Sequence, residues 1–137
     1  MNKINRKIEY SLIALKHMSQ KRPGELTTVK EISDQYQAPF DVTAKVMQRL
    51  TGAGFLKAEQ GSTGGYHITK DLTKLTLQDL MESFQGPTEI AKCLHANERC
   101  EIQSSCNIIS PIQNLNTRLN DFYKSVNLSE LINKGQG

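Results

Sequence analysis

The sequence has no run of about 18 apolar residues, the length that a helix needs to cross a lipid bilayer, so we expect no membrane-spanning segment. Its first residues, MNKINRK, lack the apolar stretch of a secretory signal peptide, and we therefore expect a cytoplasmic protein with no membrane partner. Cysteine is scarce as well. Three cysteines cannot close into a full set of disulfides, and a reducing cytoplasm would keep them as thiols or metal ligands.

The composition lacks the biases that mark disordered, collagen-like or coiled-coil chains, with 37% hydrophobic and 23% charged residues. A chain of 137 residues fits one compact domain, or one small domain with an oligomerisation element, rather than a two-domain enzyme. The net charge of +3 is too small to indicate a polyanion partner by itself. Its distribution is uneven, because residues 1–60 hold ten Lys or Arg against six Asp or Glu, whereas residues 61–137 hold seven against eight.

Two helices are predicted before residue 37. Apolar residues at helical spacing indicate an amphipathic helix over residues 6–18, which KRPG at 21–24 ends. Its apolar stripe is Ile4, Ile8, Leu12 and Leu15. Thr28 and Glu31 then have the spacing of a capping box, in which hydroxyl and carboxylate satisfy amides of the first helical turn. The second helix should bury Val29, Ile32 and Tyr36.

A third helix should follow the short turn QAP at 37–39, beginning with Asp41 as its N-cap and ending at Leu50. Val42 and Val46 lie with Leu50 on its expected inner face. Two short helices joined by a tight turn form a helix-turn-helix, whose second member fits the major groove of DNA. The outer face carries polar side chains that either meet DNA or form an ordinary solvated surface, namely Asp41, Lys45, Gln48 and Arg49.

Residues 55–59 and 66–69 are predicted to pair as two strands around GSTGG at 61–65. Glycines at the tip of such a hairpin allow positive φ and let backbone amides approach a phosphate closely. Helix, turn, helix and hairpin in this order indicate a winged helix-turn-helix, although a hairpin without a ligand is the alternative for the loop alone.

The C-terminal half should contain two further helices. Residues 75–84 carry apolar side chains at helical spacing, and QGP at 85–87 ends them. Ser110 and Pro111 resemble an N-cap followed by proline at the first helical position. Beyond them, spacings of three and four define a heptad seam of Ile112, Leu115, Leu119, Phe122 and Val126. The seam could pack within its own subunit, but we favour a two-fold dimer contact, because paired recognition helices need symmetry.

Cys93, Cys100 and Cys106 lie in a polar, aperiodic stretch, separated by six and five residues. Burial explains such cysteines poorly, whereas thiolates are ligands that iron–sulfur clusters and zinc both select. Neither gap has the short C-x-x-C spacing typical of zinc sites, so a cluster is favoured, and zinc or free redox thiols stay open. A thiol enzyme pairing Cys93 with His95, or a protein adaptor using the heptad seam, are alternatives from other classes.

Several of these segments together resemble the Rrf2 family of bacterial iron–sulfur transcription regulators. The resemblance covers nearly the whole chain and rests on the first helix, EIS at 31–33, APFDVTAKVMQRL at 38–50, GSTGGY at 61–66, the three cysteines and LSELI at 128–132. It implies that residues 41–49 are the recognition helix, that residues 60–65 are the wing, and that the three cysteines bind a cluster.

The resemblance also implies a fourth cluster ligand. One branch of the family uses a histidine three residues after the last cysteine, but Ile109 stands there in this sequence. The nitric-oxide-sensing branch, which TAKVMQRL resembles more closely, uses a carboxylate from the partner subunit at the position of Glu9. Glu9 is therefore the implied ligand, and His95 is the rival donor. The alternative for Glu9 is that it is an ordinary solvated or ion-paired surface residue. A four-iron cluster is favoured over a two-iron cluster.

The sequence thus predicts a mainly α fold with a small β wing, in which a winged helix-turn-helix is joined to a long C-terminal dimerisation helix. We expect a DNA-binding unit over residues 1–86, a cluster loop over 87–110 and a dimerisation helix with its tail over 111–137. The predicted function is a homodimeric repressor that binds a palindromic operator in double-stranded DNA and responds to nitric oxide or oxidants. The expected DNA contacts are Thr28, Pro39, Asp41, Lys45, Gln48, Arg49, Gln60, Ser62, Thr63 and Gly64.

Overall fold

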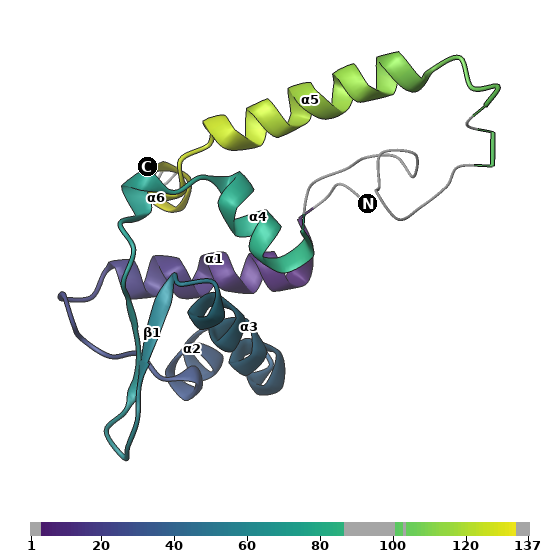
Figure 1. The fold of residues 1–137 in the computed structure, drawn as a ribbon. Coiled ribbons are helices and arrows are strands. Elements are labelled where there is room, and N and C mark those ends of the chain that lie inside the picture. The colour runs from purple at the N-terminus through teal and green to yellow at the C-terminus, as the bar shows by residue number, and fades with distance from the viewer. Residues whose placement is uncertain (1–3, 87–100, 103, 134–137) are drawn as a thin grey trace.

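A computed structural model describes residues 4–86, 101–102 and 104–133 of the chain. It is mainly helical with one two-stranded antiparallel sheet, as the sequence predicts. Figure 1 shows α1 (Arg6–Ser19) crossing the middle, with α2 (Val29–Tyr36), α3 (Phe40–Gly52) and the sheet on one side. On the other side lie α4 (Leu77–Gln85), α5 (Ile109–Ser125) and α6 (Leu128–Asn133). Cys93, Cys100 and His95 lie outside the described residues.

Helix α1 is the centre of the core. Asn5 caps its start by accepting a hydrogen bond from the Ile8 amide, where the first turn leaves donors unpaired. The buried face differs slightly from the predicted stripe, because Ile4 is exposed and Leu12 is half-buried. The face that contacts α3, α4 and α6 is made of Ile8, Ser11, Ala14, Leu15 and Met18.

The helix-turn-helix forms as predicted in outline, with three local corrections. The Thr28 hydroxyl accepts from the Glu31 amide, but the Glu31 carboxylate turns to α1 instead of completing the capping box. Tyr36 is exposed rather than buried, because its hydroxyl reaches His17 at the protein surface. Helix α3 begins one residue before Asp41, with Pro39 as its N-cap, so Asp41 lies in the first turn and is not the cap.

The wing consists of β1 (Leu56–Glu59) and β2 (Gly65–Ile68), paired so that Leu56 faces Ile68 and Glu59 faces Gly65. The predicted strands are therefore confirmed to within a residue. An isolated bridge between Thr27 and Tyr66 joins the hairpin to the segment before α2. Because Leu56 is buried in the core, the base of the hairpin is fixed while its tip extends from the body.

Helix α4 follows a 3-10 turn, η1 (Leu72–Lys74), which lies outside the helices and strands predicted from the sequence. The side chains of Thr76 and Asp79 form a complete capping box at the start of α4. Leu80 and Met81 enter the core beneath the C-terminal part of the chain. The predicted fourth helix is thus confirmed, although it begins two residues later than residue 75.

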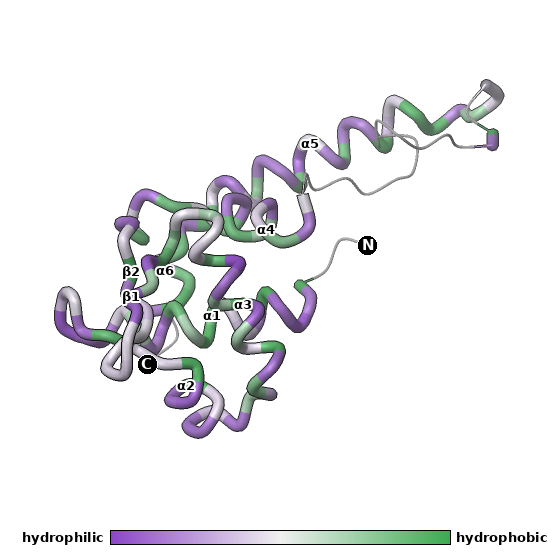
Figure 2. The backbone as a smooth tube through the Cα atoms, turned by 60° about the horizontal axis from the view of Figure 1, so that its bottom comes forward, coloured by the Kyte–Doolittle hydropathy of each residue, from purple (hydrophilic) through white to green (hydrophobic). Residues whose placement is uncertain are grey.

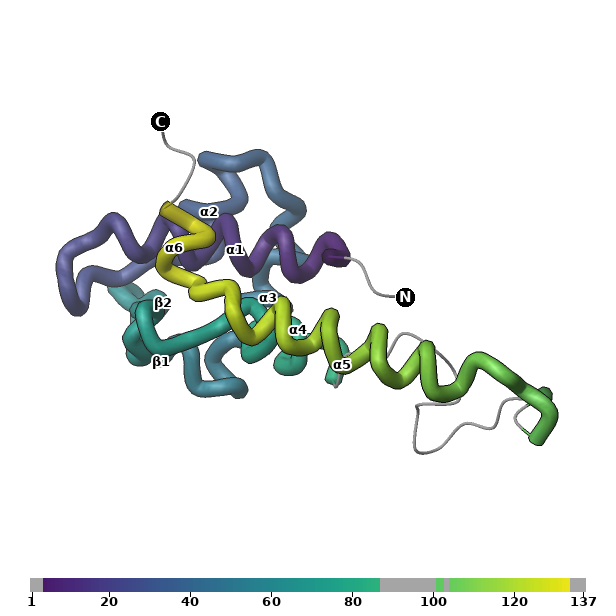
Figure 3. Tube along the Cα trace, turned by 90° about the horizontal axis from the view of Figure 1, so that it is seen from above, coloured from purple at the N-terminus to yellow at the C-terminus, as the bar shows by residue number. Residues whose placement is uncertain are grey.

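Helix α5 begins at Ile109 with Ile108 at its N-cap, so Ser110 lies inside the helix and is not the cap that we predicted. None of its residues is buried, and it packs mainly on α4. Figures 2 and 3 show it extending from the body, and the hydropathy colours of Figure 2 show both apolar and polar positions along its length. Among the described residues, no helix is both long and apolar enough to cross a membrane.

Helix α6 returns the chain to the winged helix. The Leu77 amide donates to the Val126 carbonyl at 2.8 Å, and the Leu128 amide donates to the Leu75 carbonyl at 2.9 Å. Leu128 and Ile132 are buried in the same apolar cluster as Ile8. The end of the predicted dimerisation segment therefore contributes to the core of the N-terminal unit.

Candidate nucleic-acid interface

Helix α3, the predicted recognition helix, is two-sided. Thr43, Val46, Met47 and Leu50 are buried, and the opposite side is exposed. Lys45, Gln48 and Arg49 lie on the exposed side and make no ion pair or side-chain hydrogen bond within the described part of the chain. Side chains without internal partners keep their donors available for an external ligand.

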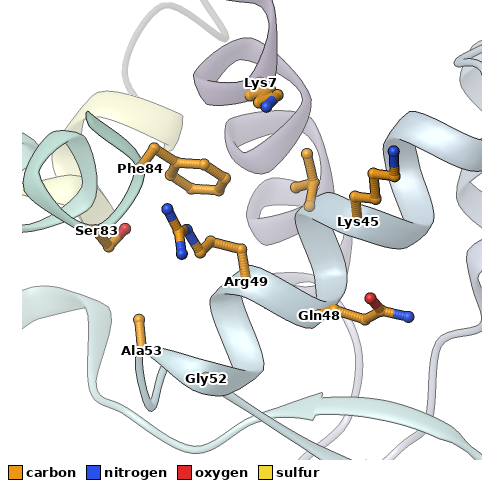
Figure 4. Close-up of a pocket in the computed structure, with 9 residues that line it drawn as sticks. Lys7, Lys45, Gln48, Arg49, Gly52, Ala53, Ser83 and Phe84 are labelled. Atoms are coloured by element: carbon orange, nitrogen blue, oxygen red, sulfur yellow. The ribbon is translucent and has the colours of Figure 1, made fainter. Parts of the chain in front are cut away.

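The three polar side chains do not point the same way. In Figure 4, Gln48 points away from α4, whereas the Arg49 guanidinium points toward Ser83 and Phe84 of α4. Arg49 therefore lies at the α4 side of the exposed α3 surface that carries Lys45 and Gln48. Lys45 and Gln48 lie on one face of α3 and Arg49 turns toward α4, and all three residues line the same hollow.

Pro39, the N-cap of α3, is exposed, as are Phe40 and Asp41 in its first turn. Phe40 is a further candidate contact, which the set predicted from the sequence for this helix (Pro39, Asp41, Lys45, Gln48 and Arg49) leaves out. It is 54% exposed, an unusual position for a large apolar ring in a chain with few aromatic residues. The signal was present in the sequence, since Phe40 lies off the stripe formed by Val42, Val46 and Leu50.

A polar cluster fixes α2, and with it α3, against α1. His17 contacts Tyr36 through Nδ1 at 2.7 Å and Glu31 through Nε2 at 2.5 Å. Lys21 Nζ lies 2.7 Å from the same carboxylate oxygen and donates to the Leu26 carbonyl. Partial burial would raise the pKa of Glu31, but hydrogen bonds from Lys21 and His17 outweigh it and hold that pKa below its ordinary value. The ionised Glu31 carboxylate therefore helps to hold α2 against α1.

The wing tip presents small and polar side chains, with Gln60, Ser62 and Thr63 exposed. Gly64 is irreplaceable in this conformation, because a Cβ on it would collide with the backbone carbonyl oxygen of Glu59. Thr28 is also exposed, but its hydroxyl is already used as the α2 cap. Figure 1 shows the wing and α3 projecting from the same side of α1.

Two of the predicted cluster ligands lie within the described residues. Glu9 is an exposed carboxylate on the first turn of α1, with Arg6 3.4 Å away. Cys106 is a half-buried free thiol two residues before the N-cap of α5. In the described ranges no three metal-binding side chains lie together, and the other two cysteines fall outside those ranges.

Comparison with known proteins decides the family. The profile of the Rrf2 family, described as an iron-dependent transcriptional regulator, matches residues 4–134. The chain belongs to the Rrf2 family. Its relatives include an HTH-type transcriptional regulator of Aquifex aeolicus, 29% identical over 92% of this chain and 88% of that protein. The HTH-type regulator NsrR of Bacillus subtilis is 28% identical over 77% of this chain and 73% of that protein.

Solved structures share the fold of this Rrf2 chain. The global cysteine regulator CymR of B. subtilis superposes with a TM-score of 0.72, at 20% identity, over 96% of this chain and 97% of that one. The oxidized form of Staphylococcus aureus CymR has a TM-score of 0.73 at 16% identity, covering 98% and 99%. These neighbours confirm the winged-helix fold. The chain is thus a transcriptional regulator rather than an enzyme, in a family whose members bind DNA and are typically dimers.

Proposed function

We propose that this regulator is a homodimeric repressor that binds a palindromic operator in the cytoplasm. One recognition helix α3 from each protomer enters the major groove, and the wing contacts the flanking backbone. The observation that carries this proposal is the unpaired polar face of α3 beside an exposed wing tip. Side chains on α3 would read base edges, while the wing amides and hydroxyls would position the protein on phosphates.

The dimer contact would be the part of the heptad seam that lies on α5, from Ile112 to Phe122; Val126, predicted as the last seam residue, is instead the C-cap of α5 and packs against the core. Leu115 is 47% exposed and Phe122 is 59% exposed, although both lie on the predicted seam. A row of exposed apolar residues along a helix is unfavourable in water, and a second copy of the protein would bury them. A two-fold axis there would place the recognition helices about one DNA turn, roughly 34 Å, apart.

We further propose that Cys93, Cys100 and Cys106 bind an iron–sulfur cluster, with Glu9 of the partner protomer as the fourth ligand. The two described donors fit this role, because the Cys106 thiol is free and the Glu9 carboxylate is exposed. A bound cluster would supply a linkage that nitric oxide or oxidants can dismantle. A carboxylate is a harder, weaker ligand than a thiolate, so it would leave one iron as the labile corner.

The position of Cys106 explains how such binding would reach the DNA. The described chain leaves α4 at Gly86 and re-enters just before α5, and these two helices pack against each other. Fixing Cys106 would fix the start of α5 and therefore the dimer seam. Loss of that constraint would loosen the spacing of the two recognition helices, and a change of about 1.4 kcal/mol would alter DNA affinity tenfold.

A thiol switch without a cluster is the second candidate. It is favoured by one observation, the free and half-buried Cys106 in a fold that CymR, a cysteine regulator with a solved oxidized form, shares. A zinc site would retain the same DNA-binding role with different sensor chemistry. Metal analysis separates the three chemistries.

In the first step of the test, the anaerobically purified protein selects its operator from a pool of random DNA duplexes. Affinity for that operator is then measured by fluorescence anisotropy before and after nitric oxide. We expect specific binding that weakens at least tenfold on exposure. Retention of no specific duplex would contradict the DNA-reading proposal, and an unchanged affinity would contradict the sensor proposal alone.

A further inference from the structure

A hollow of about 620 Å³ lies between α1, α3 and α4, beside the reading face of α3. Of the lining residues that the structure describes, three are cationic, Lys7 from α1 with Lys45 and Arg49 from α3, and none is acidic. Ser83 and Phe84 of α4 close the side opposite Lys45. Figure 4 shows Lys7 above the hollow and the Arg49 guanidinium reaching across it.

These three cations differ from the ion-paired basic residues of the chain. Arg6, Lys21 and Lys30 each lie within 3.4 Å of a carboxylate oxygen. Within the described ranges, Lys7, Lys45 and Arg49 have no carboxylate partner, although they surround the same space. Like charges gathered around one hollow repel each other, and an anion bound between them would remove that repulsion.

We propose that this hollow binds a phosphate group. The planar guanidinium of Arg49 can donate two parallel hydrogen bonds to phosphate oxygens, and the two lysines add point charges from different elements. The hollow is open and larger than a phosphate ion, so it can admit a phosphate that is still attached to a larger molecule. The shared chemistry has two sources, the backbone of bound DNA or a free phosphate-bearing solute.

The backbone of DNA is the source that the position favours, and this part of the inference depends on the proposed operator binding. The hollow adjoins the α3 face that carries Gln48, so a duplex read by that face would pass the hollow. A phosphate held there would bridge α1, α3 and the last turn of α4. Its affinity would therefore depend on where α4 lies, and α4 leads directly toward the cysteine segment.

The DNA arm of the test uses Lys7→Gln, because Lys7 is exposed and lies off the recognition helix. We expect weaker binding by a similar factor on the selected operator and on unrelated duplexes, and a salt dependence whose slope falls by about 1. Lys74→Gln, an exposed lysine in η1, is the matched control and should leave both quantities unchanged. Equal unfolding temperatures of both variants and the wild type would exclude a folding defect.

Single methylphosphonate replacements in the selected operator then locate the contact. One position in each half-site should weaken wild-type binding but cause no further loss in Lys7→Gln. A parallel arm titrates DNA-free protein with inorganic phosphate at constant ionic strength and follows the amide signals of Ser83 and Phe84. The hollow would be assigned to a free phosphate-bearing solute if phosphate caused saturating shifts of these amide signals, Lys7→Gln abolished the shifts, and the salt slope of DNA binding did not change.

The proposal would be overturned if Lys7→Gln left the salt slope of DNA binding unchanged and inorganic phosphate shifted no amide signal of Ser83 or Phe84. Failure of operator binding as such gives a different result, because wild-type protein would then select no duplex. The phosphate titration does not involve DNA, so it would still test the hollow in that case.

Discussion

Replacing Phe40 by alanine tests whether the first turn of α3 enters the major groove. A phenylalanine side chain presents roughly 200 Å² of surface, of which the 54% exposed in this protein is about 110 Å². If DNA covers half of that, about 55 Å² leaves water. At about 25 cal/mol per Å² the contact contributes about 1.4 kcal/mol, so Phe40→Ala should weaken operator binding about tenfold.

The chemistry of the base edge makes this prediction specific. The 5-methyl group of thymine is the apolar feature of the major groove that a phenyl ring contacts. Replacing thymines of the selected operator by uracil, one at a time, removes a single methyl, worth about 0.8 kcal/mol or about fourfold in affinity. We expect one such position per half-site to weaken the wild type and to leave Phe40→Ala unaffected.

Phe40→Leu is the matched control, because it keeps an apolar side chain and should retain most of the uracil effect. Affinities are measured by anisotropy titration at one fixed salt concentration, since DNA binding varies steeply with salt. Identical uracil profiles for the wild type and Phe40→Ala would refute the placement of this turn against the bases.

Three further predictions concern the described residues. Lys45→Ala should weaken operator binding by about 1 to 3 kcal/mol in an anisotropy titration, and wild-type affinity would place the reading face elsewhere. Leu128→Ala should lower the free energy of unfolding in urea by about 2 to 5 kcal/mol, because this side chain is fully buried; a loss below 1 kcal/mol would mean that α6 does not join the core. Since the folded state lowers the pKa of Glu31, its ionised form stabilises the protein above the unfolded value of about 4.3, and that contribution is lost as pH falls through the folded pKa. Glu31→Gln should therefore cost up to about 1 kcal/mol at pH 7 and less below pH 4, and an equal cost at both pH values would contradict the ion-pair role.

Periodicity and caps predicted most of the fold. The stripe of Ile8 and Leu15, the Thr28 cap and the glycine-rich tip have local causes, and local causes are visible in a sequence. Glu31 shows the limit: its spacing from Thr28 fits a capping box, but its carboxylate instead binds His17 of α1 and Lys21 of the loop after α1. Residue spacing cannot predict these contacts of Glu31, because they form only after α1 and α2 pack together.

The site could be predicted in part for the same reason. Sequence spacing placed Lys45 and Gln48 on the outer face of α3, where the structure has them. It could not show that Arg49 turns toward Phe84, since these two residues are far apart along the chain. It also gave no sign that Lys7 joins them, because the hollow exists only once three helices have assembled.

Helix α6 shows a further limit. LSELI at 128–132 was recognised only through the family resemblance and was assigned to the dimerisation segment. In the structure, Leu128 and Ile132 complete the core that α1 begins. The reason is a long-range one, because the hydrogen bonds between residues 75–77 and 126–128 bring α6 back to α1.

The central claim is that three thiolates of this regulator hold an iron–sulfur cluster. Iron and acid-labile sulfide in protein purified under argon test it most directly, with Cys106→Ser measured beside the wild type. We predict a brown wild-type protein containing both elements and a colourless variant. A colourless wild-type protein with stoichiometric zinc, or with no metal at all, would contradict the claim.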